Sequence, residues 1–311
     1  MTEENGLCSN TINQIATDNQ GSLWGATDNG IFRINTPSFY THFTPEEGLR
    51  GEVTTLYRHK QEFYAGTLHG LFIYNKEHSH FEPLSSITQS CWQLKESPSG
   101  ILYAATSNGL FRINGHKAEA VSDNNTFSLQ FNPSDPQTIY TGEIDGIYLF
   151  KGKKKKKIAN IEKVIKLEFA NNRLWAETLY GEIYRFKSDF SSPLLQGSTQ
   201  GLKAPGGNKM YVINQAIYVF SQYGFQHWNE NQQQFIKYAS PLDSLITDNT
   251  WWPGLYAETS TGQSWITGGD GKSIITFTNG KIDKERSRIL HVTKNYTIRA
   301  LYPEENGVVW L

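Results

Sequence analysis

The side chains of this chain that could do chemistry are aromatic rings and planar polar groups. Recognition of a sugar needs flat aromatic faces against the sugar ring and a few preformed polar groups for its hydroxyls. Seven residues of these types form the candidate ligand-binding set: Trp251, Trp252, Tyr180, Tyr223, His69, Arg50 and Asp270. A competing interpretation is that Trp251 and Trp252 pack between structural units, because Trp is highly buried on average.

Catalytic motifs are missing from the sequence. The segment from Asp18 to Trp24 is similar to the Asp box of sialidases, but its Gly follows the Asp by three residues where that box has two. The sequence has no Gly-x-Ser-x-Gly, phosphate loop or dinucleotide fingerprint, and its acidic residues are too dispersed to nominate the carboxylate pair that glycoside hydrolysis requires. We therefore predict no catalytic residue and no enzyme activity for this chain.

Metal ligands and cysteines are equally sparse. The eight histidines are scattered, without a His-Glu-x-x-His motif or paired cysteines, so we predict no metal and no cofactor. Cys8 and Cys91 form either a disulfide or two separate buried thiols. The basic run of Lys151 and residues 153–157 either docks a sulfated glycan or lies on an exposed outer strand, where lysines block edge pairing.

An internal repeat decides which elements position these residues. A Trp or Tyr is followed six residues later by a Gly in seven places: Trp24/Gly30, Tyr64/Gly70, Tyr103/Gly109, Tyr140/Gly146, Trp175/Gly181, Tyr218/Gly224 and Trp265/Gly271. Successive aromatics are 40, 39, 37, 35, 43 and 47 residues apart, a period that is typical of propeller blades. An Asn or Asp often precedes the Gly, which indicates a tight hairpin between two strands.

The pattern around each hairpin predicts a blade of four antiparallel strands. In most copies an apolar stretch lies upstream of the aromatic strand and a less regular strand lies downstream of the Gly. We therefore predict an all-β fold, a seven-bladed β-propeller of four-stranded antiparallel blades, over residues 1–295. Residues 296–311 read as the start of an eighth repeat, which either closes the ring or begins a second propeller.

The same topology predicts where a ligand would bind. In an antiparallel meander, the hairpin from the second to the third strand and the crossing from one blade to the next emerge at one end of the ring. His69, Tyr180, Tyr223 and Asp270 fall on the hairpins, whereas Arg50, Trp251 and Trp252 fall on the crossings. We expect these residues to share that end, which we call the hairpin face.

Charge and hydropathy exclude some classes of partner. The formal net charge is −1, so nothing indicates general attraction to nucleic acid or to an anionic membrane. No run of about 18 apolar residues predicts a membrane span. The first five residues, Met1 to Asn5, have no apolar core of a secretion signal, and the last repeat stops at Trp310. We therefore expect the chain to be a piece of a longer protein.

Several copies resemble the two-component regulator propeller repeat. The first copy resembles it over its whole length, with Gly6-Leu7 followed by Asn13-Gln14-Ile15, Asp18, Gly21, Leu23-Trp24 and the run from Thr27 to Ile31. Gly48-Leu49 with Tyr64 to Thr67 and Gly70-Leu71 forms a good second copy, and Ala104 to Leu110 forms the core of a third. Copies four to seven are degenerate.

The resemblance implies a periplasmic sensor domain of a hybrid two-component system, in which the parent protein is an inner-membrane histidine kinase. Its expected ligand is an oligosaccharide or another small polar molecule. Its expected partners are a second propeller, downstream domains of the same chain and a second copy in a homodimer, but no nucleic acid. The alternatives are a scaffold propeller that binds proteins through its rim and a propeller glycosidase or lyase.

Overall fold

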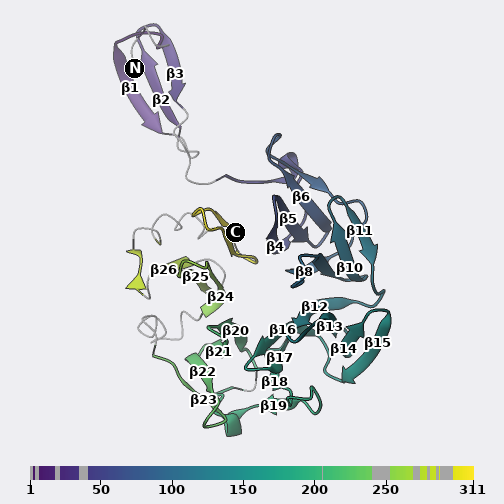
Figure 1. Ribbon diagram of the computed structural model, residues 1–311. Coiled ribbons are helices and arrows are strands. Elements are labelled where there is room, and N and C mark those ends of the chain that lie inside the picture. Colours follow the sequence, from purple (N-terminus) through teal and green to yellow (C-terminus); the bar gives the residue numbers. More distant parts are fainter. Residues whose placement is uncertain are drawn as a thin grey trace. The chain divides into compact units, whose positions relative to one another are not determined.

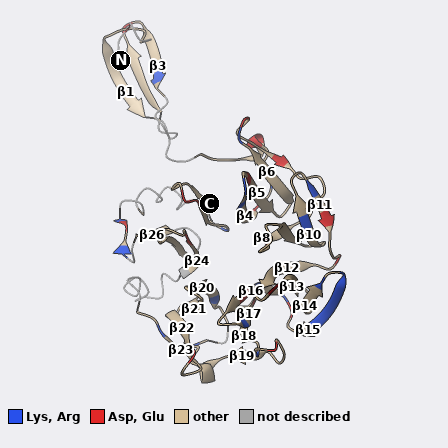
Figure 2. Cartoon of the chain, in the orientation of Figure 1, with Lys and Arg blue, Asp and Glu red and all other residues tan. Residues whose placement is uncertain are grey.

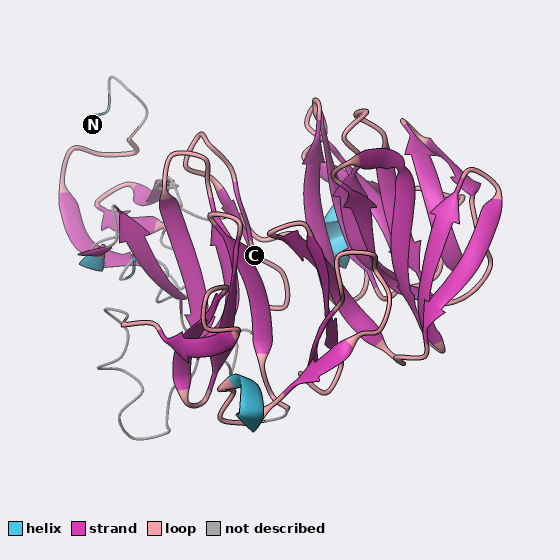
Figure 3. Ribbon diagram, turned by 60° about the horizontal axis from the view of Figure 1, so that its bottom comes forward, coloured by secondary structure: helices cyan, strands magenta, loops and turns pink. Residues whose placement is uncertain are grey.

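The chain is built almost entirely of short antiparallel strands. The computed structural model describes residues 3, 7–17, 22–34, 41–204, 206–239, 253–268, 274–278, 281–284, 287 and 297–311. The helical elements with assigned bounds are the two single-turn 3-10 segments η2 (Pro45–Glu47) and η3 (Ser198–Gln200), and strands dominate Figure 3. The predicted all-β class is confirmed. Within the described residues, no helix is long and apolar enough to cross a bilayer.

The chain forms two compact units, Met1–Glu46 and Glu47–Leu311. The first unit contains one three-stranded sheet in the order β1 (Ile12–Thr17), β2 (Leu23–Thr27) and β3 (Gly30–Ile34). Its Trp24/Gly30 interval spans the predicted hairpin, with Thr27 paired to Gly30. The predicted domain boundary at residue 295 stays a prediction.

The second unit contains six four-stranded antiparallel sheets, each formed by four consecutive strands (Figure 1). The first strands are β4 (Val53–His59), β8 (Cys91–Glu96), β12 (Thr126–Asn132), β16 (Val164–Ala170), β20 (Lys209–Ile213) and β24 (Pro253–Glu258). The second strands are β5 (Glu62–Thr67), β9 (Leu102–Thr106), β13 (Asp135–Glu143), β17 (Arg173–Thr178), β21 (Ala216–Ser221) and β25 (Gln263–Gly268).

The outer half of each sheet is shorter on average. The third strands are β6 (Gly70–Asn75), β10 (Gly109–Asn114), β14 (Gly146–Lys151), β18 (Ile183–Arg185), β22 (Gly224–Asn229) and β26 (Ile274–Thr278). The fourth strands are β7 (His80–Pro83), β11 (Lys117–Ala120), β15 (Lys154–Ala159), β19 (Leu194–Gln196), β23 (Gln234–Lys237) and β27 (Lys281–Ile282). These sheets are the four-stranded antiparallel blades that the repeat predicts.

A seventh sheet of the second unit is formed by β28 (Tyr302–Pro303) and β29 (Val309–Trp310). On one side, Val309 packs against the cluster of Trp265 and Ile274 from the preceding blade. On the other side, the Trp310 indole stacks on Phe63 of β5 with ring centroids 4.1 Å apart. The last sheet therefore contacts both the blade before it and the first blade of this unit.

Four of the repeated aromatics are buried in the blades. Tyr64, Tyr140, Trp175 and Trp265 are each 1–2% exposed. Gly70 and Gly146, which follow Tyr64 and Tyr140 by six residues, are the first residues of the third strands β6 and β14. At Gly109 the backbone has a φ of +116°, and a Cβ there would come within 1.9 Å of the Ser122 carbonyl oxygen. The spacing of an aromatic residue and a Gly therefore serves the fold: the aromatic packs in the blade and the Gly fits the hairpin.

Polar side chains connect the first strands of neighbouring blades, which we call the inner strands. Each of these bonds joins a side chain to the backbone of the next inner strand: Leu94 N to Thr55 Oγ1 (3.3 Å), Leu129 N to Gln93 Oε1 (2.7 Å), Ser128 Oγ to Val164 O (2.8 Å), Lys166 Nζ to Met210 O (2.8 Å) and Tyr211 OH to Gly254 O (2.8 Å). Because separate sheets share no backbone ladder, these side chains supply the polar contacts between blades.

The basic run lies on the outer strand β15, as one of its two interpretations predicts (Figure 2). Lys155 is 2.7 Å from the fully buried carboxylate of Glu143, and Lys157 is 3.0 Å from Asp145. These two lysines therefore neutralise acidic groups of their own blade.

We expect the contact that joins the seventh sheet to the first blade of this unit to weaken in acid. Burial alone would raise the pKa of Glu304, but hydrogen bonds from Arg58 and Trp310 lower it below its ordinary value. A carboxylate with a lowered folded-state pKa stabilises the fold fully above the unfolded value of about 4.3 and loses this contribution as the pH falls through the folded value. Urea unfolding at pH 7 and pH 3 should therefore show a smaller pH dependence for Glu304→Gln than for the wild type.

Glu119→Gln is the control for this experiment, because the Glu119 side chain is 73% exposed. Equal pH dependence of the wild type and Glu304→Gln would contradict the role of Glu304.

Candidate functional site

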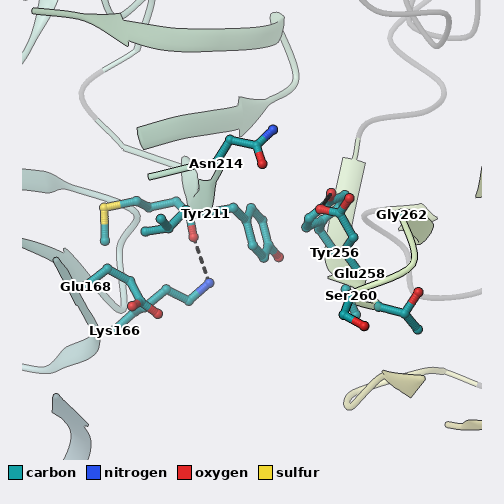
Figure 4. A pocket seen from close by; sticks show the side chains of 12 residues that line it. Lys166, Glu168, Tyr211, Asn214, Tyr256, Glu258, Ser260 and Gly262 are labelled. Atoms are coloured by element: carbon teal, nitrogen blue, oxygen red, sulfur yellow. Dashed lines mark hydrogen bonds between the residues drawn. The ribbon is translucent and has the colours of Figure 1, made fainter. Parts of the chain in front are cut away.

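A pocket of about 730 Å³ lies where three consecutive inner strands meet (Figure 4). Strand β16 contributes Lys166 and Glu168. Strand β20 and the turn after it contribute residues 210–212 and Asn214. Strand β24 and its turn contribute residues 256–260 and Gly262. The pocket therefore extends to the end of the blades at which first and second strands join, which is opposite to the hairpin face.

Lys166 is held in place on one wall of this pocket. Its Nζ donates to the Met210 carbonyl oxygen at 2.8 Å, the bond drawn in Figure 4, and lies 4.0 Å from the centroid of the Tyr211 ring. A cation over an aromatic face is attracted by the ring quadrupole. The ammonium group is therefore fixed by the scaffold and presents a directed positive charge beside the pocket.

A buried carboxylate behind this wall balances the charge. The Glu177 side chain is 1% exposed, and its oxygens lie 4.0 Å from Lys166 Nζ and 3.4 Å from Lys209 Nζ. The backbone N–H of Met210 donates to Glu177 Oε2 at 2.7 Å. Because a buried charge is tolerated only when it is paired and hydrogen-bonded, Glu177 couples β17 to β20.

Glu168 is the acidic group of the same strand. Gln130 Nε2 donates to its Oε2 at 2.6 Å, and Lys95 Nζ lies 3.5 Å from the same oxygen. These contacts come from β12 and β8, so Glu168 joins three inner strands. These two partners orient its carboxylate.

Two tyrosines provide the aromatic surface of the pocket. The rings of Tyr211 and Tyr256 have centroids 5.6 Å apart, and the Tyr256 hydroxyl donates to Glu258 Oε2 at 2.6 Å. Burial raises the pKa of both phenols, with the Glu177 charge adding to the effect at Tyr211 and the Glu258 bond at Tyr256. Both phenols therefore remain protonated at neutral pH and act as hydrogen-bond donors rather than as bases.

This combination suits recognition of a polar, uncharged or weakly charged ligand. Aromatic faces, carboxylates, an amide at Asn214 and a hydroxyl at Ser260 converge on one cavity. Such a set can accept several hydroxyl hydrogens and donate to ring oxygens. Among the described residues, no group of three or more His, Cys, Asp or Glu side chains is placed to hold a metal ion.

The residues of the predicted set lie elsewhere. Tyr180 is 62% exposed and accepts a hydrogen bond from Lys163 Nζ at 3.0 Å. Tyr223 is 46% exposed and lies in the hairpin between β21 and β22. The backbone N–H of His69 donates to Thr67 Oγ1 at 3.0 Å. None of these three residues lines the pocket.

Arg50 is exposed and precedes Gly51, over which the His69 ring packs so closely that a Cβ would come within 2.2 Å of Nδ1. Arg50 and His69 are therefore brought to the same part of the hairpin face. Trp251, Trp252 and Asp270 lie outside the described residues. The hairpin-face set stays a prediction.

The sequence contains a pattern that indicates some of the pocket residues, and it lies one strand upstream of the repeated aromatics. Each inner strand places one residue opposite the repeated aromatic: Lys95 pairs with Tyr103, Glu168 with Trp175 and Tyr211 with Tyr218. These inner-strand residues are polar or amphipathic, whereas the aromatics are blade core. Scanning the strand upstream of each aromatic for such residues would have nominated Glu168 and Tyr211.

The two cysteines differ in their environment. Cys91 is completely buried at the start of β8, and burial raises the pKa of its thiol to about 12. A thiol that stays protonated at neutral pH is a poor nucleophile. Cys91 is therefore a buried packing residue, whereas Cys8 is partly buried and belongs to the other compact unit, so the choice between a disulfide and separate thiols stays open.

Comparison with known proteins supports the fold. No protein-family model matches the chain, and no curated protein matches it significantly in sequence. The chain is similar in structure to the extracellular domain of BT3049, a predicted hybrid two-component system of B. thetaiotaomicron, with a TM-score of 0.67 and 14% identity. That similarity covers 97% of this chain but only 44% of the other, so this chain spans less than half of that domain.

Two further structures with the same kind of fold have different functions. PorZ, a surface component of the type-IX secretion system of Porphyromonas gingivalis, has a TM-score of 0.52 at 10% identity, over 88% of this chain and 38% of that one. A streptogramin B lyase has a TM-score of 0.53 at 12% identity, over 98% and 91%. At these identities the similarities show the fold alone. The resemblance to sensor propellers is thus confirmed at the level of fold.

We expect removal of Glu177 to destabilise the scaffold around the pocket. In Glu177→Ala, the Met210 N–H loses its acceptor and two lysines lose their counter-charge, which should lower the free energy of unfolding by about 3 kcal/mol. Urea denaturation measures this difference. The exposed pair of Arg112 and Glu119 supplies the control, because Glu119→Ala should cost less than about 0.5 kcal/mol. Equal stability of the two variants would show that Glu177 has no such role.

Proposed function

We propose that this chain is the ligand-sensing propeller of an extracytoplasmic sensor, and that its ligand binds in the pocket between β16, β20 and β24. The single observation that carries this proposal is the lining of the pocket. Lys166, Glu168 and Tyr256 place a cation, a carboxylate and a phenol around one cavity of about 730 Å³. A cavity of this size accommodates a small ligand.

The expected ligand class is an oligosaccharide or another small polar molecule. The tyrosine rings offer flat faces to a sugar, and Glu258, Asn214 and Ser260 offer acceptors and donors to its hydroxyls. The protonated phenols and the anchored Lys166 favour binding over proton transfer. We therefore propose a binding role without catalysis for this chain.

The wider context of the sensor is part of the same proposal. The fold similarity to the extracellular domain of BT3049 supports a periplasmic position in an inner-membrane sensor. In such a sensor the signal passes to a hybrid histidine kinase through a second propeller and downstream domains, and a homodimer is the expected assembly. The hairpin-face residues Arg50, His69, Tyr180 and Tyr223, with Trp251, Trp252 and Asp270, are proposed as contacts to the ligand or to that second propeller.

Calorimetry of the purified chain against a panel of neutral and acidic oligosaccharides tests the proposed function. We expect at least one compound to bind, and Glu258→Ala to weaken its binding about tenfold, because a hydrogen bond to a charged group contributes about 1.5 kcal/mol or more. Glu119→Ala, on the outer part of another blade, should bind as the wild type does. A panel without a single binder would contradict the proposed function.

If compounds bind but Glu258→Ala keeps wild-type affinity, the pocket is the wrong site. The same titrations with Tyr180→Ala and Tyr223→Ala then show whether the hairpin face binds the ligand.

A further inference from the structure

The inner strands share a distortion at their first residues. In β4, β8, β12 and β16 the pairing with the second strand shifts after the first residue, which leaves one residue in a β-bulge. The bulged residues are Thr54, Trp92, Phe127 and Ile165. A bulge turns a side chain out of the regular alternation of the strand, and bulges are common at the rims of barrels and beside binding sites.

These bulges lie at the hairpin face. The N–H of Ser107, in the hairpin between β9 and β10, donates to the carbonyl oxygen of Ser90 at 2.9 Å, and the N–H of Ile144 donates to Asn125 at 3.1 Å. Ser90 and Asn125 directly precede β8 and β12. The start of each inner strand is therefore tied to a hairpin, at the opposite end of the blades from the pocket.

Two neighbouring bulges carry aromatic rings. Trp92 and Phe127 have ring centroids 5.8 Å apart at an interplanar angle of 40°. Both side chains are half-buried, and neither belongs to the buried hydrophobic clusters found among the described residues of these blades. The two rings thus form a tilted aromatic pair outside the hydrophobic cores of their blades.

Polar groups without partners adjoin the pair. The Trp92 indole Nε1 and the Asn125 side-chain oxygen have no hydrogen-bond partner among the described residues. One is a donor and the other an acceptor, and both atoms are buried, so a ligand reaches them only when neighbouring side chains move aside. Buried polar atoms without partners are rare and require an explanation.

The surroundings of the pair carry no net charge. Residues 89–93 and 124–128 contain no charged side chain. Asn124 donates to Glu143 at 2.6 Å and to Asp145 at 3.2 Å, but Lys155 and Lys157 already pair with these carboxylates. These two segments therefore supply no counter-charge to a charged ligand.

We propose that Trp92 and Phe127 form a second ligand site, at the hairpin face between β8 and β12, which takes the apolar face of a neutral sugar ring. The ring stacks on the half-buried aromatic pair, and a movement of side chains that uncovers Trp92 Nε1 and Asn125 Oδ1 lets its hydroxyls bond to them. This proposal rests on the proposed sensing function and adds a contact distinct from the pocket around Tyr256.

Titration of neutral oligosaccharides and methyl glycosides into the full chain tests the second site. Trp92→Ala should weaken binding of neutral sugars at least tenfold, and Phe127→Leu, which removes the ring but keeps an apolar side chain, should weaken it at least threefold. Trp92→Phe, which keeps an aromatic ring but removes the Nε1 donor, should weaken binding less than Trp92→Ala does. Tyr238→Ala is the matched control, because Tyr238 is an aromatic residue that is 42% exposed after β23, and it should bind as the wild type does.

The outcomes separate this proposal from the proposed function. Weakened neutral-sugar binding in Trp92→Ala and Phe127→Leu supports the second site, whether or not Glu258→Ala also weakens binding at the pocket. Wild-type affinity in Phe127→Leu and Trp92→Ala, with loss in Glu258→Ala, overturns the second site and leaves the proposed function intact. Binding of acidic sugars alone overturns it as well, whereas a chain that binds no compound at all contradicts both proposals. Phe127→Leu decides the case if Trp92→Ala does not fold.

Discussion

The hydrogen bonds between neighbouring inner strands are the constraint on which the rest of this structure depends. Each blade pairs its strands within one sheet, and the sheets share no strand pairing with one another. Gln93, Ser128 and Lys166 each bond to the backbone of the following inner strand and thereby set its position. Burial of apolar surface stabilises the contact between neighbouring blades, and these directional hydrogen bonds fix the alignment of their inner strands.

The candidate pocket is a local variation of this arrangement. At other junctions between inner strands, short or neutral side chains such as Thr55 and Ser128 form the hydrogen bond to the neighbouring blade. At the junctions around β20, the longer side chains of Lys166 and Tyr211 form it, and the pocket lies beside them. The same side chains therefore align the blades and line the cavity. A ligand in the pocket would contact the groups that hold three blades together.

Much of the fold could be predicted because the repeat depends on local backbone chemistry. The interval from Tyr103 to Gly109 reports a strand, a tight hairpin and a second strand, and all three are read from neighbouring residues. The buried aromatics and the outer position of the lysine run followed from the same logic. The contacts of the two-stranded seventh sheet were harder to predict from the sequence, because the stacking of Trp310 on Phe63 joins residues that are far apart in the sequence.

The candidate site was harder to predict for a related reason. A polar residue on an inner strand, such as Gln130 or Tyr256, has the same local pattern whether it bonds to the next blade or lines a cavity. Only the spacing of three strands distinguishes the two roles. The bulges at Trp92 and Phe127 were equally hidden, since a one-residue shift in pairing leaves no mark in composition or periodicity.

Native-state hydrogen exchange at the Leu94 and Leu129 amides tests the central claim most directly. Both N–H groups donate across a blade junction to a side chain, Thr55 and Gln93 respectively. The account predicts strong protection of both amides in the wild type, and faster exchange of the Leu129 amide in Gln93→Ala while amides within the blade sheets stay protected. Unprotected exchange of both amides in the wild-type chain would contradict it.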